Sequence, residues 1–384
     1  MAEVLNRFGV ETYYIYLGKE SSGHDSTQFH YGNRIEKWDL SREFQNILGH
    51  PRKVIERLSR IKEKYKIFHC LATGRRAYYL QQAGINYKYW SYGADLDYQC
   101  FIRVGLRNIL FGRGFKINPY RILVEQIQAR DSIRYSDSVM ITPYQLKALK
   151  KIDTGKNLFF LPHCFKIIDY HILLQQKEEN RNLICKEVKA EQFFFSSVRQ
   201  AWTGDQKKMT DNKGNDVMLY SFEKYLKLTK DDRTKLVLVK KGSDIKSTKS
   251  LSKSLRITNN VVWVDEMRRE ELDRFYQGAA ICFGQFGTPV VTYAALEPLA
   301  NCSISISLLN ENDSIVPFYM EAPPIFNSKN PKEIADFMVR IVFEKENYAD
   351  LSYKSWLWTK NHCSEEKFVQ SFLEQFEEAH RWET

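Results

Sequence analysis

Short runs of β-branched and aromatic residues alternate with longer amphipathic stretches along the chain, and this alternation constrains the fold more than any other feature. Such a pattern is typical of parallel sheets that are covered by helices. Strands are expected at residues 12–17, 66–71, 87–92, 138–142, 158–161, 192–196, 235–240, 261–264, 280–283 and 303–308. Helices are expected at residues 52–64, 74–83, 120–130, 144–150, 216–226, 269–276, 293–300 and 331–344. The sequence therefore predicts an α/β protein with two successive β/α arrays.

The length of the chain favours two domains, because 384 residues are more than one hydrophobic core usually organises. We predict an N-terminal Rossmann-like domain over residues 1–170 and a C-terminal Rossmann-like domain over residues 185–345. The join is placed in residues 162–189, where the strand pattern lapses and a polar run covers residues 175–182. In the remaining residues, 346–384, Trp and Phe at helical spacing predict helices that pack back on a domain.

Basic residues are concentrated in one part of the chain. The net charge of the whole sequence is +10, and residues 51–150 hold 19 Lys and Arg against 7 Asp and Glu. Within this part, residues 101–116 interleave large apolar side chains with cations. They fit either a helix with a buried apolar side or a basic amphipathic surface that lies on an anionic membrane. A basic domain favours a negatively charged partner, such as nucleic acid, a membrane surface or a phosphorylated substrate.

The N-terminus and the cysteines bear on the cellular compartment. The first residues lack the cationic and apolar regions of a signal peptide, and no run approaches the roughly eighteen apolar residues that span a bilayer. The 7 cysteines lie far apart, without a Cys-x-x-Cys pair or a His at ligand spacing. We therefore expect a cytoplasmic protein with reduced thiols and with neither a disulfide framework nor a structural metal site.

Two cations stand where the second array is expected to bind a ligand. Ligands of such sheets bind beyond the carboxyl ends of the strands. Arg199 follows the strand at 192–196, and Lys213 precedes Gly214 just before the next helix. Cations beside a helix N-terminus suit a pyrophosphate group, because both the side chains and the free N–H groups of the helix attract anions.

Taken in order, Arg199, the pair Lys213-Gly214, the strand at 261–267 and the element that ends in Glu297-Pro-Leu-Ala resemble the donor domain of a GT-B glycosyltransferase. The resemblance is to the large retaining family that uses nucleotide-diphosphate sugars, family 4, also called glycosyl transferases group 1. In that family an Arg and the Lys of a Lys-Gly pair contact the donor diphosphate, and a Glu opening a helix binds the ribose hydroxyls. The resemblance thus implies donor-binding roles for Arg199, Lys213 and Glu297.

The same resemblance implies two Rossmann-like domains that face each other across a cleft. It also implies that the loop with Gln285, Gly287 and Thr288 contacts the donor phosphate or sugar, and that residues 261–267 form a wall beside the base. No metal or other cofactor is expected, because the family stabilises the diphosphate with side chains and backbone.

The chain departs from the family pattern at several positions. Pro289 stands eight residues before Glu297, where the family often has a second Glu. Gln285 stands twelve residues before Glu297, as in a subset of the family, but Gly284 replaces the Asp of that subset. Cys302 lies near the place of a Gly that normally follows the helix.

The first half holds the residues that we expect to face the reacting sugar and the acceptor. His24 lies in a Gly-containing loop after the first strand, and Tyr92 takes the place of a family His three residues before Asp95. We assign His24, Tyr92 and Asp95 as the candidate catalytic residues. Asp95 and Asp97 also match the Asp-x-Asp motif of metal-dependent GT-A enzymes. The residues of the second half of the chain instead favour a metal-independent GT-B site.

The sequence predicts a hexosyltransferase-like enzyme that moves a sugar from a uridine or guanosine diphosphate sugar to a surface-glycan acceptor, lipid-linked or polysaccharide, with retention. We place it in the cytoplasm, either free or on the inner face of the membrane through the basic region 51–150. One alternative is a nucleic-acid glycosyltransferase that modifies bases of phage DNA, since a basic domain would suit that acceptor too. Another alternative is a non-catalytic GT-B partner subunit, which the departures at Tyr92, Pro289 and Cys302 would fit.

Overall fold

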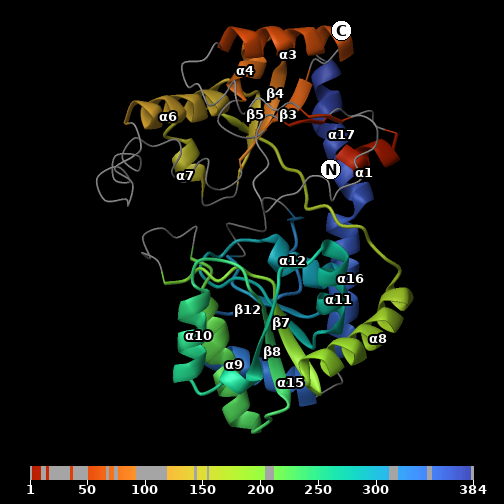
Figure 1. The fold of residues 1–384 in the computed structure, drawn as a ribbon. Helices are drawn as coiled ribbons and strands as arrows, with labels where there is room; N and C mark the ends of the chain where they lie inside the picture. The colour runs from red at the N-terminus through yellow and green to blue at the C-terminus, as the bar shows by residue number, and fades with distance from the viewer. Residues whose placement is uncertain are drawn as a thin grey trace. The chain divides into compact units, whose positions relative to one another are not determined.

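The computed structural model describes residues 2–9, 14–16, 35–37, 51–65, 69–72, 77–91, 119–141, 145–153, 155–203, 212–310, 319–343 and 348–381 (Figure 1). The chain divides into two compact units. The first unit comprises Met1–Leu161 together with Val369–Thr384, and the second comprises Pro162–Phe368. The end of the chain therefore returns to the first unit. Among the described residues, no helix is both long enough and apolar enough to cross a membrane.

The first unit contains two parallel sheets. The smaller sheet pairs β1 (Tyr14–Tyr16) with β2 (Ile35–Lys37), and the larger sheet has the order β3-β4-β5-β6. The strands of the larger sheet are β3 (His69–Ala72), β4 (Asn86–Trp90), β5 (Ser138–Met140) and β6 (Asn157–Leu158). The helices are α1 (Ala2–Arg7), α3 (Pro51–Tyr65), α4 (Tyr78–Gln82), α6 (Pro119–Arg134) and α7 (Leu146–Leu149). The prediction is confirmed for the described strands β1 and β3 to β6, whereas β2 and α1 were not expected.

Burial explains how β4 anchors the larger sheet. The side chains of Tyr87 and Tyr89, two residues apart on the strand, are both fully buried among residues of α6 and α7. The hydroxyl of Tyr87 donates a hydrogen bond to the carbonyl of Ser132 at 2.7 Å, so the polar end of this buried ring is satisfied. Because β-strand side chains alternate between faces, the two tyrosines together hold α6 on one face of the sheet.

The second unit is built on one six-stranded parallel sheet with the order β12-β11-β10-β7-β8-β9. Its strands are β7 (Gln192–Ser196), β8 (Thr234–Val239), β9 (Val261–Val264), β10 (Ile281–Phe283), β11 (Ser305–Ser307) and β12 (Phe326–Asn327). Its helices are α8 (Tyr170–Val188), α9 (Asn215–Thr229), α10 (Ile245–Ser254), α11 (Arg269–Gly278), α12 (Tyr293–Ala300), α15 (Pro331–Phe343) and α16 (Tyr348–Cys363). A 3₁₀ turn covers Thr258–Asn260, and α17 (Glu365–Arg381) follows α16 and crosses into the first unit.

The strand order identifies where this sheet binds a ligand. In chain order, the first three strands β7, β8 and β9 lie side by side in one half of the sheet. The next three, β10, β11 and β12, continue from β7 in the opposite direction, which gives the Rossmann strand order. The connections change direction between β7 and β10, which are neighbours in the sheet. In open parallel sheets the crevice for ligands lies beyond the carboxyl ends of the strands at this switch point.

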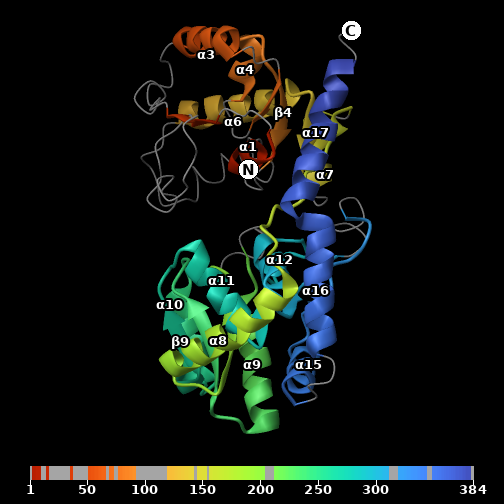
Figure 2. The same ribbon diagram turned by 90° about the vertical axis from the view of Figure 1, so that its right-hand side faces the viewer.

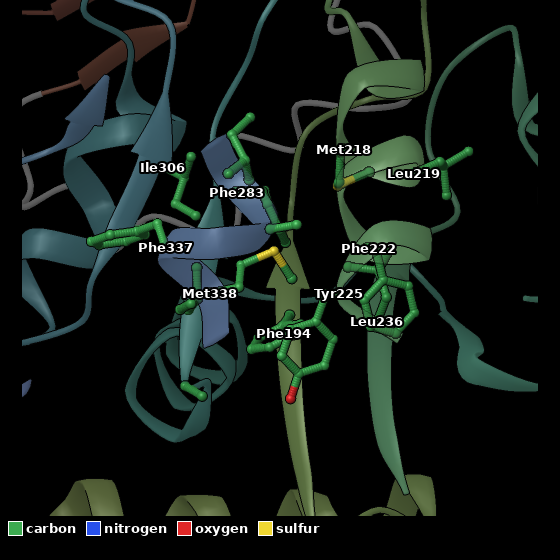
Figure 3. Close-up of a cluster of buried hydrophobic side chains, with 14 of the residues drawn as sticks. Phe194, Met218, Leu219, Phe222, Tyr225, Leu236, Phe283, Ile306, Phe337 and Met338 are labelled. Atoms are coloured by element: carbon green, nitrogen blue, oxygen red, sulfur yellow. The ribbon is translucent and has the colours of Figure 1, made fainter. Parts of the chain in front are cut away.

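Alternate residues of β7 build the two faces of the core. Phe194 packs against α9 and α15, in a cluster that also holds Leu236, Phe283 and Met338 (Figure 3). Phe193 and Phe195 point to the opposite face, where α8 and α11 cover them. All three phenylalanines are fully buried, so neither face of β7 meets water. A near-continuous apolar strand of this kind is expected where helices cover both faces of a parallel sheet.

The two units divide between Leu161 and Pro162, at the start of the segment 162–189 in which a join was predicted. The structure has the 19-residue helix α8 there, and it packs against α11 in the second unit (Figure 2). Asp169 caps the helix, since its side chain accepts N–H groups of His171 and Ile172, and Lys189 ends it in the left-handed conformation. The predicted polar run lies within this helix and contains Lys177, which is buried and donates to the carbonyl of Cys302 at 2.5 Å.

The terminal helices were predicted correctly as a pair. In α16, the indole N–H of Trp356 donates to the carbonyl of Ile168 at 2.9 Å, and Trp358 is buried against Tyr319. Phe368 at the start of α17 is also buried. Trp356, Trp358 and Phe368 are therefore core residues of the second unit.

A buried histidine at the start of the second unit gives a pH-dependent prediction. Nδ1 of His163 lies 2.5 Å from the hydroxyl of Tyr319, and its ring packs on Tyr293. Burial lowers the pKa of His163 from 6.5 to about 4. Because the folded state disfavours the charged ring, stability is full above the unfolded pKa and falls as the pH drops from about 6.5 to 4. We expect a loss of up to about 3 kcal/mol in the free energy of unfolding over this window.

The measurement is urea unfolding of the wild type and of His163→Asn, followed from neutral pH down to pH 4. Asn offers an acceptor near the position of Nδ1 but does not titrate, so the variant should lose less stability than the wild type. Parallel pH profiles for the two proteins would show that His163 does not cause the loss.

Candidate functional site

The loops that follow β7 and β10 meet at the switch point of the second sheet. Lys213 lies between them, because its backbone N–H donates to the carbonyl of Ala201 at 2.6 Å and its carbonyl accepts the N–H of Phe286 at 2.9 Å. Ala201 belongs to the segment after β7, and Phe286 belongs to the segment after β10. The backbone of Lys213 therefore ties the two loops together just before α9.

The side chain of Lys213 is held at the same place. Its Nζ donates to Oε1 of Gln285 at 3.1 Å. Gln285 is 4% exposed, and its Nε2 donates to the carbonyl of Thr288 at 3.0 Å, so the amide group is fixed at both ends. The structure thus brings together Lys213, Gln285 and Thr288, three of the residues that the sequence assigned to donor binding.

Two glycines allow this close approach of the loops. A Cβ on Gly287 would lie 2.1 Å from the carbonyl oxygen of Asn212, and a Cβ on Gly214 would lie 2.7 Å from the N of Gly287. Gly214 is also the N-cap of α9 with a φ of 63°, a left-handed conformation that favours glycine. Its N–H donates to Oδ1 of Asn212 at 2.8 Å. No described side chain caps α9, so the positive end of the helix faces this loop junction.

The loop after β8 supports the junction from the other side. Gly242, with a φ of 107°, lies so close to Gln200 that a Cβ would be 2.3 Å from the Gln200 carbonyl oxygen. Oδ2 of Asp244 accepts the N–H groups of Trp202 at 2.6 Å and Thr203 at 2.8 Å. Burial would raise the pKa of Asp244, but these N–H groups outweigh it and hold the pKa below its usual value. Asp244 therefore stays ionised and orders the segment that carries Arg199.

No role was predicted from the sequence for Asn212 or Asp244. An Asn or Asp two residues from a Gly in a loop is a signal for a side chain that binds nearby backbone groups. The pairs Asn212-Lys-Gly and Gly242-Ser-Asp244 carry this signal. The signal predicts that the side chain binds backbone groups, but it does not identify the loop to which those groups belong.

Glu297 lies at a second position of the site, on α12. It is the fifth residue of this helix and does not open it, as the family resemblance had implied. The hydroxyl of Tyr276 donates to its Oε2 at 2.6 Å, and Arg269 forms an ion pair with its Oε1. The Glu297 side chain is 13% exposed, so the carboxylate is still reached from solvent.

The Glu297 group is joined to the end of β7. The hydroxyl of Ser197, just beyond that strand, lies 2.6 Å from the hydroxyl of Tyr276. Burial, and then the charge of Glu297, raise the pKa of Tyr276 well above its usual value, so the phenol keeps its proton. Since that proton goes to Glu297, Ser197 donates to Tyr276. The carboxylate therefore lies at the carboxyl edge of the sheet, as a ligand-binding residue must.

The other predicted residues are placed as follows. Arg199 is exposed on the segment after β7, and Gly287 is half-buried at the loop junction. His24, Tyr92, Asp95 and Asp97 lie outside the described residues, as do residues 101–116. Within the part of the chain that the structure describes, no group of three or more His, Cys, Asp or Glu side chains is arranged to hold a metal ion.

Gly287→Ala is expected to destabilise the second unit. The added Cβ would meet the backbone of Asn212 at 2.1 Å, and a backbone carbonyl cannot move aside as a flexible side chain does. We expect a loss of about 2 to 4 kcal/mol in the free energy of unfolding, as for overpacking against a rigid neighbour. Urea unfolding measures this loss.

Gly155→Ala is the matched control. The nearest atom to a Cβ on Gly155 is Oδ1 of Asp153 at 3.9 Å, which is an ordinary contact. This variant should stay within about 0.5 kcal/mol of the wild type. Equal stability of the two variants would mean that the loops after β7 and β10 do not depend on the glycine contact.

No protein-family model matches the sequence, and no curated protein matches it. Solved structures do resemble it. Anabaena HepE in complex with UDP is 9% identical with a TM-score of 0.58, and the match covers 90% of this chain and 86% of that chain. Sucrose-phosphate synthase from Thermosynechococcus elongatus is 12% identical with a TM-score of 0.62, covering 99% and 92%. A glycosyltransferase from Rickettsia africae is 13% identical with a TM-score of 0.59, covering 90% and 85%. These matches span both units and show that the chain has the GT-B fold.

Proposed function

We propose that this protein is a glycosyltransferase that takes a sugar from a nucleoside-diphosphate sugar. The observation that carries the proposal is the convergence of Lys213, Gln285 and Gly287 at the switch point of the second sheet, beside the N-terminus of α9. A cation and a helix N-terminus at that place suit a diphosphate. The GT-B fold supports the proposal, and UDP in the HepE crystal structure supports a nucleotide donor. Fold alone does not decide function, so the site carries the argument.

The proposed reaction is a substitution at the anomeric carbon of the sugar. The bond from that carbon to the donor diphosphate breaks and its electron pair passes to the diphosphate, while a bond forms to an acceptor oxygen whose proton passes to the departing diphosphate. Lys213 and Arg199 would neutralise the diphosphate as it leaves, which is the main electrostatic contribution in such a transfer. Because side chains and α9 supply this positive charge, we propose transfer without a metal ion. We also propose retention of the anomeric configuration and a hexose as the transferred sugar.

Binding to nucleoside diphosphates tests this proposal directly. We expect UDP, GDP, ADP or CDP to raise the thermal midpoint selectively, because a ligand that binds only the folded state stabilises it. Donor hydrolysis or transfer should then be detected with the corresponding nucleotide sugar. If none of the four shifts the midpoint, the proposal fails and a non-catalytic GT-B subunit becomes the better explanation.

For the acceptor we propose a surface-glycan precursor, lipid-linked or polysaccharide, in the cytoplasm at the inner face of the membrane. The observation that bears on this proposal is α3 of the first unit. Its apolar residues Val54, Leu58 and Ile61 are buried in the unit, so they cannot insert into a bilayer. Its exposed cations are Arg52, Lys53, Arg57, Arg60 and Lys64. Contact of α3 with an anionic membrane would therefore be electrostatic, and strong salt dependence is expected.

Sedimentation with vesicles separates the acceptor alternatives. We expect the protein to bind vesicles with anionic lipids at low salt and to remain in solution with neutral vesicles. Duplex DNA binding without vesicle binding would instead favour the nucleic-acid acceptor. The cytoplasmic location is consistent with the free thiols of all described cysteines, and cell fractionation tests it.

A further inference from the structure

The hydrogen bonds around Glu297 form a longer chain than a simple contact with a ligand requires. We propose that Tyr276 and Arg269 hold the Glu297 carboxylate in an orientation that accepts both ribose hydroxyls, and that they thereby set the preference for a ribonucleotide over a nucleotide that lacks the 2′ and 3′ hydroxyls. Both are positioning residues in this proposal. The inference rests on the proposed function, since it concerns how the same site binds its nucleotide.

Tyr276 fixes one oxygen of the carboxylate. Its side chain is 1% exposed, and its hydroxyl donates to Oε2 of Glu297 at 2.6 Å. The ring cannot turn away, because it packs on Phe195 at 5.4 Å between ring centres, and Ser197 holds the hydroxyl at 2.6 Å. Oε2 is therefore held by a rigid donor that is anchored to β7.

Arg269 fixes the other oxygen. Its Nε and Nη2 bind Oδ2 and Oδ1 of Asp273 at 3.1 and 3.0 Å, one turn along α11. This paired contact sets the plane of the guanidinium, and Nη1 of the same group meets Oε1 of Glu297. A guanidinium held by two parallel bonds has little freedom to rotate, so the direction of its bond to Glu297 is fixed too.

A buried amide connects the two helices that carry these residues. Nδ2 of Asn301 donates to Oδ1 of Asp273 at 3.0 Å and to the carbonyl of Glu297 at 3.0 Å. Its Oδ1 accepts Nε2 of Gln277 at 3.1 Å, and Gln277 in turn accepts Nδ2 of Asn180 on α8 at 2.7 Å. The network thus locks α12 to α11 and α8, and Glu297 is positioned before any ligand binds.

The lone pairs of the carboxylate connect this network to ribose. An ionised carboxylate offers about four acceptor positions, and Tyr276 and Arg269 use one on each oxygen. Within the part of the chain that the structure describes, one position on each oxygen is left, and the side chain is 13% exposed. Vicinal hydroxyls, such as the 2′ and 3′ groups of ribose, match two acceptors on the two oxygens of one carboxylate. A site that is built to bind a hydroxyl rejects an analogue without it, because its own polar group is then left unpaired.

The test compares a nucleoside diphosphate with its 2′,3′-dideoxy analogue, using whichever of UDP, GDP, ADP and CDP binds best. We expect the wild type to bind the ribonucleotide about 10- to 100-fold more tightly than the dideoxy analogue. In Tyr276→Phe and in Arg269→Met this ratio should fall to within about 3-fold, because Glu297 is free to turn. Calorimetry measures both affinities, and the ratio cancels a general loss of folded protein.

Tyr225→Phe is the matched control. Tyr225 is fully buried on α9, and its hydroxyl meets Nε2 of Gln192 at 3.1 Å, at the start of β7 and not at its end. This variant also loses one buried hydroxyl but should keep the wild-type ratio. An unchanged ratio in Tyr276→Phe and Arg269→Met would overturn the positioning role. A wild type that binds the nucleotide without preference for ribose would overturn the inference and leave the proposed function standing. Binding of none of the four nucleotides would overturn both.

Discussion

Lys213→Met is expected to lower kcat/KM for sugar transfer by about 10²- to 10³-fold, the usual effect of removing one group that stabilises developing charge. Nζ of Lys213 is held by Gln285 at 3.1 Å at the switch point, where we place the donor diphosphate. Met preserves the length of the side chain and removes its charge. The effect on affinity should be larger for a nucleoside diphosphate than for the nucleoside alone, because only the former carries the phosphates. Steady-state kinetics and calorimetry measure the two effects.

Lys227→Met is the control for this variant. Lys227 lies near the other end of α9, its side chain is 74% exposed, and it forms an ion pair with Glu223. An exposed ion pair of this kind contributes little, so activity and stability should stay close to those of the wild type. If Lys213→Met and Lys227→Met both keep the turnover of the wild type, the donor diphosphate does not lie at the start of α9.

Glu297→Ala is expected to weaken nucleotide binding by about 10²-fold, because the carboxylate that we propose accepts two ribose hydroxyls is lost and each charged hydrogen bond contributes about 1.5 to 3 kcal/mol. The variant also leaves Arg269 and Tyr276 without their acceptor on α12. A reduced free energy of unfolding is therefore expected together with the weaker binding. The reduction in affinity should be small for the dideoxy nucleotide, since that analogue has no hydroxyls for Glu297 to accept.

The control for Glu297→Ala is Glu223→Ala. The Glu223 side chain is 11% exposed and pairs with Lys227, so it matches Glu297 in burial and in having a cationic partner. This variant should lose stability without losing affinity for the nucleotide. Equal losses of affinity in the two variants would mean that destabilisation, and not ribose binding, explains the effect of Glu297→Ala.

Strands and helices with a strong local signal were predicted well. The bounds of β7, β9 and α12 agree with the prediction, because polar residues flank each of these mainly apolar segments. Helices α8 and α10 were missed, since their sequences are mainly polar. In α10 the buried residues are Thr248 and Ser252, whose hydroxyls donate to backbone carbonyls of their own helix at 3.0 and 2.8 Å. Such a helix has no apolar stripe for periodicity to detect.

The candidate site divides in the same way. The predicted residues Lys213, Gln285 and Thr288 do meet, because the parallel sheet brings the ends of β7 and β10 to one edge. Tyr276 and Arg269 were recognised only as residues of an amphipathic helix. Their contact with Glu297 depends on how α11 and α12 pack on the sheet, and no spacing within either helix encodes it.

The sequence by itself determined the alternation of strands and helices and the residues that follow each strand, because both depend on the order of side chains along the chain. Only the tertiary structure decided the strand order, which makes β7 and β10 neighbours although residues 197–280 separate them. It also decided that Gly287 must approach Asn212 and that Glu297 is held by two residues of another helix. The physical reason is that these contacts join distant segments, whose approach depends on packing across the whole sheet and not on local conformational preference.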